Sequence, residues 1–333
     1  MTDDGRVKIG FVGAGGIAER HVEVLRGMED VHIAAFADTD FARADRLAAT
    51  VGGEAYNSHE DMLSIQALDA VYICVPPFAH GEPEKAAICA GLPFFVEKPL
   101  SLDLATAERL AQDVERNGIV TAVGYHWRYL DTVEEARGLL TDNPARLVSG
   151  YWLDQTPPPR WWWQVERSGG QIVEQATHVI DLARHLVGEI DEVYAQAGHL
   201  SRPDFPDLDV ATSTAATVRF VNGTVGTLAA TCKLRWGHRT GLHLFCDGLA
   251  IELSDREIMV DVGRGRPVRT AQDDPVLRED RDFIDAVKGL GNRIHCPYGE
   301  ALKSHRAALA IARSAVIGRP VRVAGMAREA VDA

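Results

Sequence analysis

The sequence predicts an α/β fold: a doubly wound parallel sheet of the Rossmann type at the N-terminus, followed by an α+β domain built on a large, mostly antiparallel sheet. The chain has 333 residues, and one hydrophobic core rarely organises that many, so two domains are expected. Up to Gly124 short apolar runs alternate with amphipathic segments, whereas alternating polar and apolar runs dominate the later sequence. We therefore place the domains at residues 1–124 and 125–333.

Six parallel strands joined by crossover helices are expected in the first domain. The helical stretches include GEPEKAAICAG and LATAERLAQDVERNG, and each ends on a glycine that can adopt the left-handed conformation at a helix end. The strands are VKIGFV from Val7, VHIAAFA from Val31, a short run from Glu54 to Tyr56, AVYICV from Ala70, PFFV from Pro93 and IVTAVG from Ile119.

The second domain begins with a helical stretch from Leu130 to Leu140, passes through a tract rich in Pro and Trp, and continues with a helix from Val173 to Val187. Helical patterns return at Asp280 to Lys288 and Gly299 to Ile317. NG and DG dipeptides mark hairpins. The expected antiparallel strands are EVYAQAGHL, ATSTAATVRFV, TVGTLAATCKL, GLHLFCD, AIELSD and REIMVDV.

Composition and charge exclude several classes of protein. The net charge of -13 would repel a phosphate backbone, and no cluster of Lys and Arg offsets it, so nucleic acid is not an expected partner. No apolar run approaches the ~18 residues that span a bilayer, and the N-terminus is acidic before it is apolar, so we expect a cytoplasmic protein without a membrane partner. The five cysteines are scattered and form no CxxC pair, which argues against a disulfide framework and a zinc knot.

A glycine-rich turn directly follows the first expected strand and opens a helix. The match to GxGxxG/A consists of Gly13, Gly15 and Ala18, where Gly13 makes the tight turn, Gly15 lets a pyrophosphate approach the backbone, and Ala18 permits close packing of helix on strand. Gly16 and Ile17 begin the helix, whose unpaired N–H groups favour phosphate. In this context the motif predicts dinucleotide binding.

Asp38 closes the second expected strand, where a carboxylate can accept hydrogen bonds from the ribose hydroxyls and would repel a 2′-phosphate. The sequence therefore favours NAD over NADP. Two alternatives stay open: Asp38 as a simple turn residue, and the neighbouring Asp40 in the same role.

Beyond these motifs the sequence resembles the glucose–fructose oxidoreductase and inositol dehydrogenase family, called Gfo/Idh/MocA, over nearly the whole chain. The resemblance implies an NAD-dependent oxidoreductase that transfers hydride between nicotinamide and a hydroxyl or carbonyl carbon of a sugar, inositol or related polyol. Its motifs here are GAGGIAERH from Gly13, CVPPFAH from Cys74, AGLPFFVEKPL from Ala90, GYHWRY from Gly124 and GGQIVEQATHVIDLARHLVG from Gly169.

The resemblance implies that Glu97 and Lys98, in the sequence EKP, lie beside the nicotinamide at the carboxyl end of a strand. Open α/β sheets bind ligands at that edge, which supports the placement independently. A surface lysine is the plainer alternative for Lys98, but its position directly after an apolar strand favours an acid/base role. Val75, Pro76 and His80, in CVPPFAH, are further expected cofactor contacts.

The resemblance also implies that His178 reaches the same cleft from the second domain. The pKa range of histidine, near neutrality, favours His178 as catalytic acid or base, with Glu174 as a further catalytic candidate. Family members commonly carry Asp one turn before this histidine, whereas this chain has Glu174, which puts its contact to substrate or to His178 in question. Glu174, His178, Asp181 and His185 would share one helix face. That spacing also suits a metal site, but HExxH is absent, so we expect no metal.

Aromatic and polar residues near the domain junction are the expected substrate contacts. Trp162 and Trp163, in PPPRWWW, suit the apolar face of a sugar, although packing in the core or between subunits is an equal alternative. Tyr125, Arg128 and Tyr129, in GYHWRY, could bind substrate hydroxyls. An interdomain salt bridge explains Arg128 equally well.

The function predicted first is a dehydrogenase, because a base and a cofactor together remove the proton and hydride of an alcohol. The alternative is a non-catalytic sensor of the same fold that only binds NAD(P), and a third class, a metal-dependent hydrolase, would contain stoichiometric metal. A homodimer or homotetramer is also expected, because the small and apolar strands ATSTAATVRF and TVGTLAATCKL need cover on both faces of their sheet.

Overall fold

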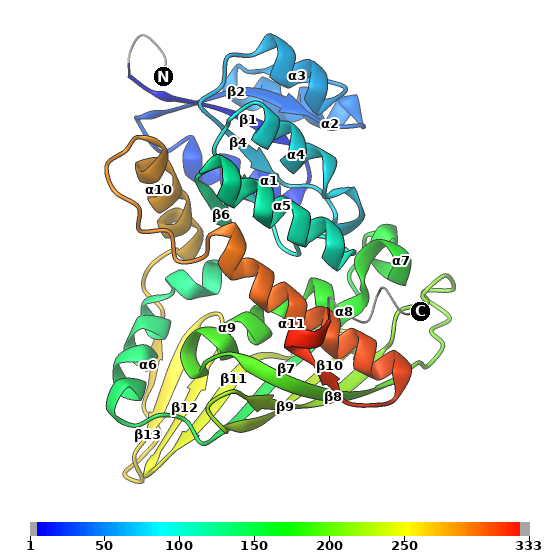
Figure 1. Cartoon of the computed structure of the whole chain (residues 1–333), viewed down its shortest axis with the longest axis vertical. Helices are drawn as coiled ribbons and strands as arrows, with labels where there is room; N and C mark the ends of the chain where they lie inside the picture. Colours follow the sequence, from blue (N-terminus) through cyan, green and yellow to red (C-terminus); the bar gives the residue numbers. More distant parts are fainter. Residues whose placement is uncertain (1–4, 327–333) are drawn as a thin grey trace. The chain divides into compact units, whose positions relative to one another are not determined.

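The computed structural model describes residues 5–326, which divide into two compact units (Figure 1). The first unit comprises the chain up to His126 together with Asp274–Leu302, and the second comprises Trp127–Asp273 with the described residues from Lys303 onward. We predicted two domains that are each continuous in sequence, residues 1–124 and 125–333. The segment Asp274–Leu302 instead packs with the first unit, which the sequence did not indicate. None of the helices within residues 5–326 is long and apolar enough to cross a membrane.

The first unit contains the predicted parallel sheet, with strand order β3-β2-β1-β4-β5-β6. The order reverses between β1 and β4, which creates the switch point where doubly wound sheets bind nucleotides beyond the carboxyl ends of the strands. The strands are β1 (Val7–Val12), β2 (Val31–Ala37), β3 (Glu54–Tyr56), β4 (Ala70–Ile73), β5 (Phe94–Val96) and β6 (Thr121–Val123).

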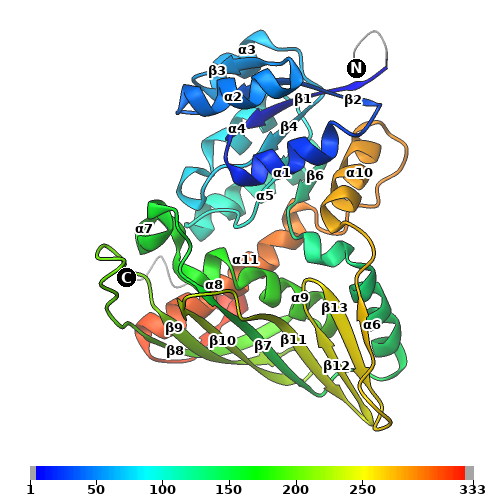
Figure 2. The same cartoon turned by 180° about the vertical axis from the view of Figure 1, so that it is seen from behind.

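Helices cover both faces of this sheet. They are α1 (Gly16–Leu25), α2 (Phe41–Val51), α3 (His59–Ile65), α4 (Glu82–Cys89), α5 (Leu104–Asn117) and α10 (Pro275–Val287). The last of these, α10, contacts α1 (Figure 2). Its Phe283 and Ile284 are fully buried in the same hydrophobic cluster as Phe11 and Phe36 of the sheet. Burial of these apolar side chains explains why the segment returns to the first unit.

The second unit is built on a mixed sheet with strand order β14-β13-β12-β11-β7-β10-β9-β8-β15. The six strands predicted for this domain are present, but β7, β14 and β15 were not predicted. Strand β7 lies in the middle of the sheet and pairs in parallel with β10. The strands are β7 (Leu147–Gln155), β8 (Ile190–Gly198), β9 (Ser213–Phe220), β10 (Val225–Leu234), β11 (Arg239–Cys246), β12 (Leu249–Leu253), β13 (Glu257–Asp261), β14 (Val268–Thr270) and β15 (Val321–Arg322).

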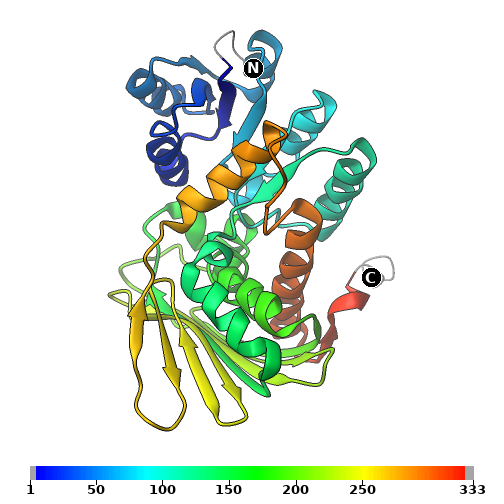
Figure 3. The same cartoon turned by 90° about the vertical axis from the view of Figure 1, so that its left-hand side faces the viewer.

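Helices pack on one face of the second sheet. They are α6 (Asp131–Asp142), α9 (Thr177–Val187) and the Lys303–Ile317 part of α11 (Tyr298–Ile317) (Figures 1 and 3). Gly150 of β7 permits the approach of α9, because a Cβ atom there would lie 2.7 Å from Val179 Cγ1. On the opposite face, β9 and β10 present small exposed side chains, and we call this the open face: Ala215, Thr217, Thr227 and Ala229.

The helix predicted from Val173 to Val187 is interrupted. Its residues form α8 (Gly170–Glu174) and α9, and the chain turns between them because the N–H groups of Gln175 and Ala176 both bond the carbonyl of Gln171. Glu174 therefore ends one helix while His178 lies in the first turn of the next. The expectation that both residues share one continuous helix face is wrong. A short helix, α7 (Val165–Ser168), precedes this pair.

Candidate active site

The glycine-rich turn has the shape that a dinucleotide requires. Gly13 has φ +90°, and a Cβ atom at this position would overlap the carbonyl oxygen of Cys74, so only glycine fits. At Gly15 and Gly16 an added Cβ atom would meet nothing within 4 Å, which leaves this side of the turn open. Gly15 caps α1, and its neighbour Ile17 is exposed. The open N-terminus of a helix beside the switch point can accept a pyrophosphate.

Asp38, directly after β2, is bound to this turn. Its Oδ2 accepts the N–H of Ala14 at 2.8 Å, and its Oδ1 accepts the N–H of Asp40 at 2.8 Å. Asp40 instead occupies the N-cap position of α2, and its side chain forms an ion pair with Arg43 at 3.2 Å. The structure therefore favours Asp38 over Asp40 as the carboxylate that faces a ribose.

The loop after β4 lies at the same edge of the sheet. Val75 and Pro76 follow the strand and are partly exposed. His80 is buried, and its Nδ1 lies 2.5 Å from Glu84 Oε1, which fixes the ring. His80 Nε2 has no hydrogen-bond partner within the described chain. A cofactor contact from His80 stays a prediction, and Nε2 is the atom that could make it.

The EKP segment follows β5, the next strand of the sheet. Glu97 points into the protein: it is 5 % exposed, and its Oε1 lies 3.2 Å from His21 Nε2. Direct contact of the Glu97 carboxylate with a cofactor is therefore disfavoured. Lys98 is partly exposed, and the Lys98–Pro99 peptide bond is cis.

In the second unit, the imidazole of His178 lies in a group of nearly parallel aromatic rings. The ring of Trp127 is 5.6 Å from it at 19°, and the ring of Trp152 is 6.0 Å from it at 20°. Trp127 belongs to the 3-10 segment His126–Tyr129, and Trp152 belongs to β7. Sequence reasoning missed both tryptophans, although Trp127 lies within the motif GYHWRY. These rings restrict how the imidazole can turn.

Glu174 is held by Trp162. The indole N–H of Trp162 donates to Glu174 Oε2 at 2.7 Å, and the Trp162 ring is 1 % exposed in a cluster with Leu208 and Val210. The structure therefore favours packing over substrate contact for Trp162. Trp163 is only partly buried, although its N–H donates to the carbonyl oxygen of Pro157 at 2.8 Å. A sugar contact from Trp163 stays a prediction.

Arg128 forms a buried salt bridge within the second unit. Its Nε and Nη2 each donate to one oxygen of Asp181 at 2.7 Å. The salt-bridge alternative is thus favoured for Arg128, but within one unit rather than between domains. Tyr125 is 1 % exposed in a hydrophobic cluster of the first unit and Tyr129 is 2 % exposed. A substrate contact from either residue stays a prediction.

Two known domain families match this chain. Residues 7–125 match the family described as "Oxidoreductase family, NAD-binding Rossmann fold", and residues 145–252 match the "GFO/IDH/MocA C-terminal domain". The chain belongs to the Gfo/Idh/MocA family. As a member of this family it is an oxidoreductase that binds NAD through its first unit, in agreement with the prediction from Gly13, Gly15 and Asp38.

Several known proteins are similar to this Gfo/Idh/MocA oxidoreductase in sequence or in fold. An uncharacterized oxidoreductase, YrbE of Bacillus subtilis, is 27% identical over 96% of this chain and 97% of its own. Myo-inositol 2-dehydrogenase of Thermotoga maritima is 26% identical over 72% of each chain. The solved structure of a levoglucosan dehydrogenase in complex with NADH superposes with a TM-score of 0.86 at 22% identity and covers 96% of this chain and 99% of that chain.

Proposed function

We propose that this protein is an NAD-dependent dehydrogenase of a sugar, inositol or related polyol. The observation that carries the proposal is the position of Lys98, two residues after the end of β5 in the unit that binds the dinucleotide. Relatives named as inositol dehydrogenases support the substrate class. A sensor that only binds NAD would need neither Lys98 nor the imidazole of His178.

Proton transfer is the task of the side chains. When bound, NAD accepts or donates the hydride. We assign the hydroxyl proton to His178, because histidine is the side chain that most often serves as general acid or base. Lys98 donates a hydrogen bond to the same oxygen and stabilises its developing charge. Glu174, fixed by the indole of Trp162, orients the imidazole or binds a neighbouring hydroxyl.

The direct test of this function is a substrate panel. Sugars, inositols, amino sugars and glycosides are offered to the purified protein with NAD, and reduced nicotinamide is followed by absorbance. We expect turnover of at least one polyol class. Tight binding of NAD, measured by calorimetry, without turnover of any member of the panel in either direction would favour the sensor instead.

Asp38 should determine the choice between NAD and NADP. Because its carboxylate is fixed by the N–H groups of Ala14 and Asp40, a 2′-phosphate would meet a negative charge that cannot turn away. Asp38→Ser should therefore bring the dissociation constants of NAD and NADP, measured by calorimetry, closer together. Asp40→Ser is the matched control and should leave the ratio unchanged. Equal or tighter binding of NADP by the unaltered protein would contradict this assignment.

We also propose that the open face is covered by a second copy of the chain. Its exposed residues on β9 and β10 are small and mostly uncharged, which suits the packing of one sheet on another. Light scattering should find a homodimer or homotetramer at micromolar concentration. Ala229→Lys should dissociate it, whereas Val316→Lys, at a residue of α11 that is 85 % exposed, should not. A monomeric unaltered protein would refute this proposal.

A further inference from the structure

A chain of buried polar side chains runs through the first unit beneath the EKP segment. His21 of α1 is at its centre: its Nδ1 lies 2.9 Å from Asp280 Oδ1, and its Nε2 lies 3.2 Å from Glu97 Oε1. The hydroxyl of Tyr72 donates to Asp280 at 3.2 Å. His21 and Asp280 are both 0 % exposed. Four elements, namely α1, β4, α10 and the end of β5, are joined by these contacts.

The charges of the cluster follow from this geometry. An imidazole donates to a carboxylate at each ring nitrogen only if it carries both protons. Burial alone would lower the pKa of His21, but the carboxylates of Asp280 and Glu97 outweigh burial and raise this pKa well above its ordinary value. Burial likewise raises the pKa of Glu97, yet the hydrogen bond and the charge of His21 lower it overall. His21 is therefore an imidazolium between two carboxylates.

The Glu97 carboxylate is held in position by contacts on three sides. Its Oε2 accepts the main-chain N–H of Lys98 at 3.2 Å, and its Oε1 faces His21. On a third side it packs against Gly124, where a Cβ atom would overlap the carboxylate. Because this carboxylate accepts the main-chain N–H of Lys98, a shift of the carboxylate weakens a contact that holds the Lys98 main chain.

We propose that His21 and Asp280 are positioning residues, which hold Glu97 and through it the main chain of Lys98. The effect on turnover depends on the proposed role of Lys98, whereas the charge and contacts of His21 do not. The arrangement also explains why α10, which lies far along the sequence, is packed in the nucleotide-binding unit: it supplies Asp280, the carboxylate on the far side of His21.

An alternative interpretation is that this cluster holds a metal ion, with Glu279, the neighbour of Asp280, as one of the ligands. Ligand atoms of His21, Glu97 and Glu279 lie within 4.8 Å of one another. An imidazolium that donates to a carboxylate at each ring nitrogen has no lone pair left to bind a metal. Burial raises the pKa of Glu279 well above its ordinary value, and its carboxyl oxygens have no hydrogen-bond partner within residues 5–326. A neutral, protonated Glu279 accounts for both observations.

The first experiment reads the charge of His21 without turnover. In protein labelled with ¹⁵N-histidine, both ring nitrogens of His21 should remain protonated at a pH where an ordinary histidine has lost its proton. Asp280→Asn should lower the pKa of His21. Because the folded pKa is raised, the stabilisation by His21 is complete below the unfolded value of about 6.5 and is lost as pH rises through the folded value. A His21 ring that is neutral at pH 7 would overturn the proposal.

The second experiment compares two Glu→Gln variants in the same cluster. Glu97→Gln should lower kcat on the order of 10-fold to 10²-fold, while the dissociation constant of NAD changes by less than about threefold. Glu279→Gln replaces an already neutral group and should match the unaltered protein in both quantities. Rates are expressed per folded protein, determined from near-UV circular dichroism.

Three results would overturn the positioning role. The first is that Glu97→Gln and Glu279→Gln have the same kcat and the same dissociation constant of NAD. The second is a loss of kcat in Glu97→Gln that is fully explained by a smaller folded fraction, and the third is stoichiometric metal in the unaltered protein that Glu279→Gln removes. If the unaltered protein turns over no polyol of the panel, the proposed function fails. The ¹⁵N measurement still judges the contacts of His21 in that case.

Discussion

Alanine at Lys98 or at His178 should lower kcat on the order of 10²-fold or more. Oxidation of an alcohol requires the hydroxyl proton to leave as hydride moves, and in the proposed mechanism His178 takes this proton while Lys98 stabilises the oxygen. Initial rates with the best polyol of the panel measure the loss. The dissociation constant of NAD should barely change, because Gly13 and Asp38 remain intact.

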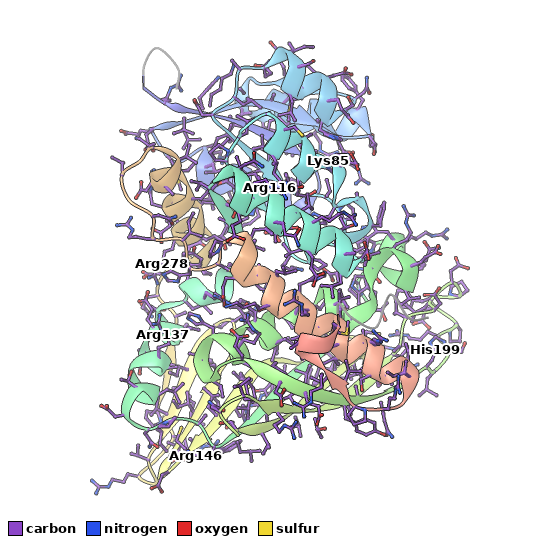
Figure 4. The ribbon with its side chains drawn as sticks, viewed as in Figure 1. Lys85, Arg116, Arg137, Arg146, His199 and Arg278 are labelled. Carbon is purple, nitrogen blue, oxygen red and sulfur yellow. The ribbon has the colours of Figure 1, made fainter. Side chains whose placement is uncertain are left out.

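Matched controls separate this effect from a general loss of charge. Lys85→Ala removes a lysine of α4 whose side chain is 61% exposed, and His199→Ala removes an exposed histidine of the second unit; Figure 4 labels both residues. Neither variant should alter kcat. The double variant Lys98→Ala/His178→Ala should be far less impaired than the product of the single losses, because groups that act as a unit are non-additive. Near-normal turnover in either single variant would disprove the assignment.

The strands of the first unit could be predicted because parallel strands are buried on both faces and therefore form continuous apolar runs. Strand β7 was missed for the opposite reason. Its sequence, LVSGYWLDQ, contains glycine and polar residues and lies close to the proline tract. Its pairing with β10 joins distant parts of the chain, and no local pattern records such a contact. The sequence therefore also concealed Trp152.

The return of α10 to the first unit was not predicted either, although its helical pattern was recognised. Val276, Asp280, Phe283 and Ile284 lie on one face of this helix, and all four are buried. A charged residue within an apolar stripe signals a buried partner of opposite charge. Here the signal was present, but the partner, His21, lies on α1, and sequence spacing alone could not connect them.

Sequence reasoning anticipated the local geometry best where a motif fixes the backbone: Gly13 has the positive φ of a tight turn, and Asp38 is bound to that turn. It was least informative where side chains from separate elements meet. Arg128 was assigned to substrate or to a domain contact with equal weight, and only the structure pairs it with Asp181. This pairing links the 3-10 segment that carries Trp127 to the helix that carries His178.

Breaking that salt bridge should destabilise the second unit strongly. Arg128→Met leaves the carboxylate of Asp181 buried, at 1 % exposure, where the hydroxyl of Ser304 still donates to Oδ1 at 2.5 Å. Removal of one member of a buried pair typically costs about 3–5 kcal/mol, because a buried charge then lacks its counter-ion. Urea denaturation followed by tryptophan fluorescence measures the loss.

The control for Arg128→Met is a variant that breaks an ion pair exposed to solvent. Arg116, labelled in Figure 4, lies 2.8 Å from Asp113 with its side chain 70% exposed, so Arg116→Met should cost less than about 0.5 kcal/mol. The double variant Arg128→Met/Asp181→Leu replaces both charges and should regain much of the stability. Because Asp181 and His178 lie on adjacent turns of α9, the double variant should still show reduced kcat if the salt bridge also aligns the imidazole with Trp127. Full activity in a stable double variant would show that the salt bridge contributes to stability but does not align the imidazole.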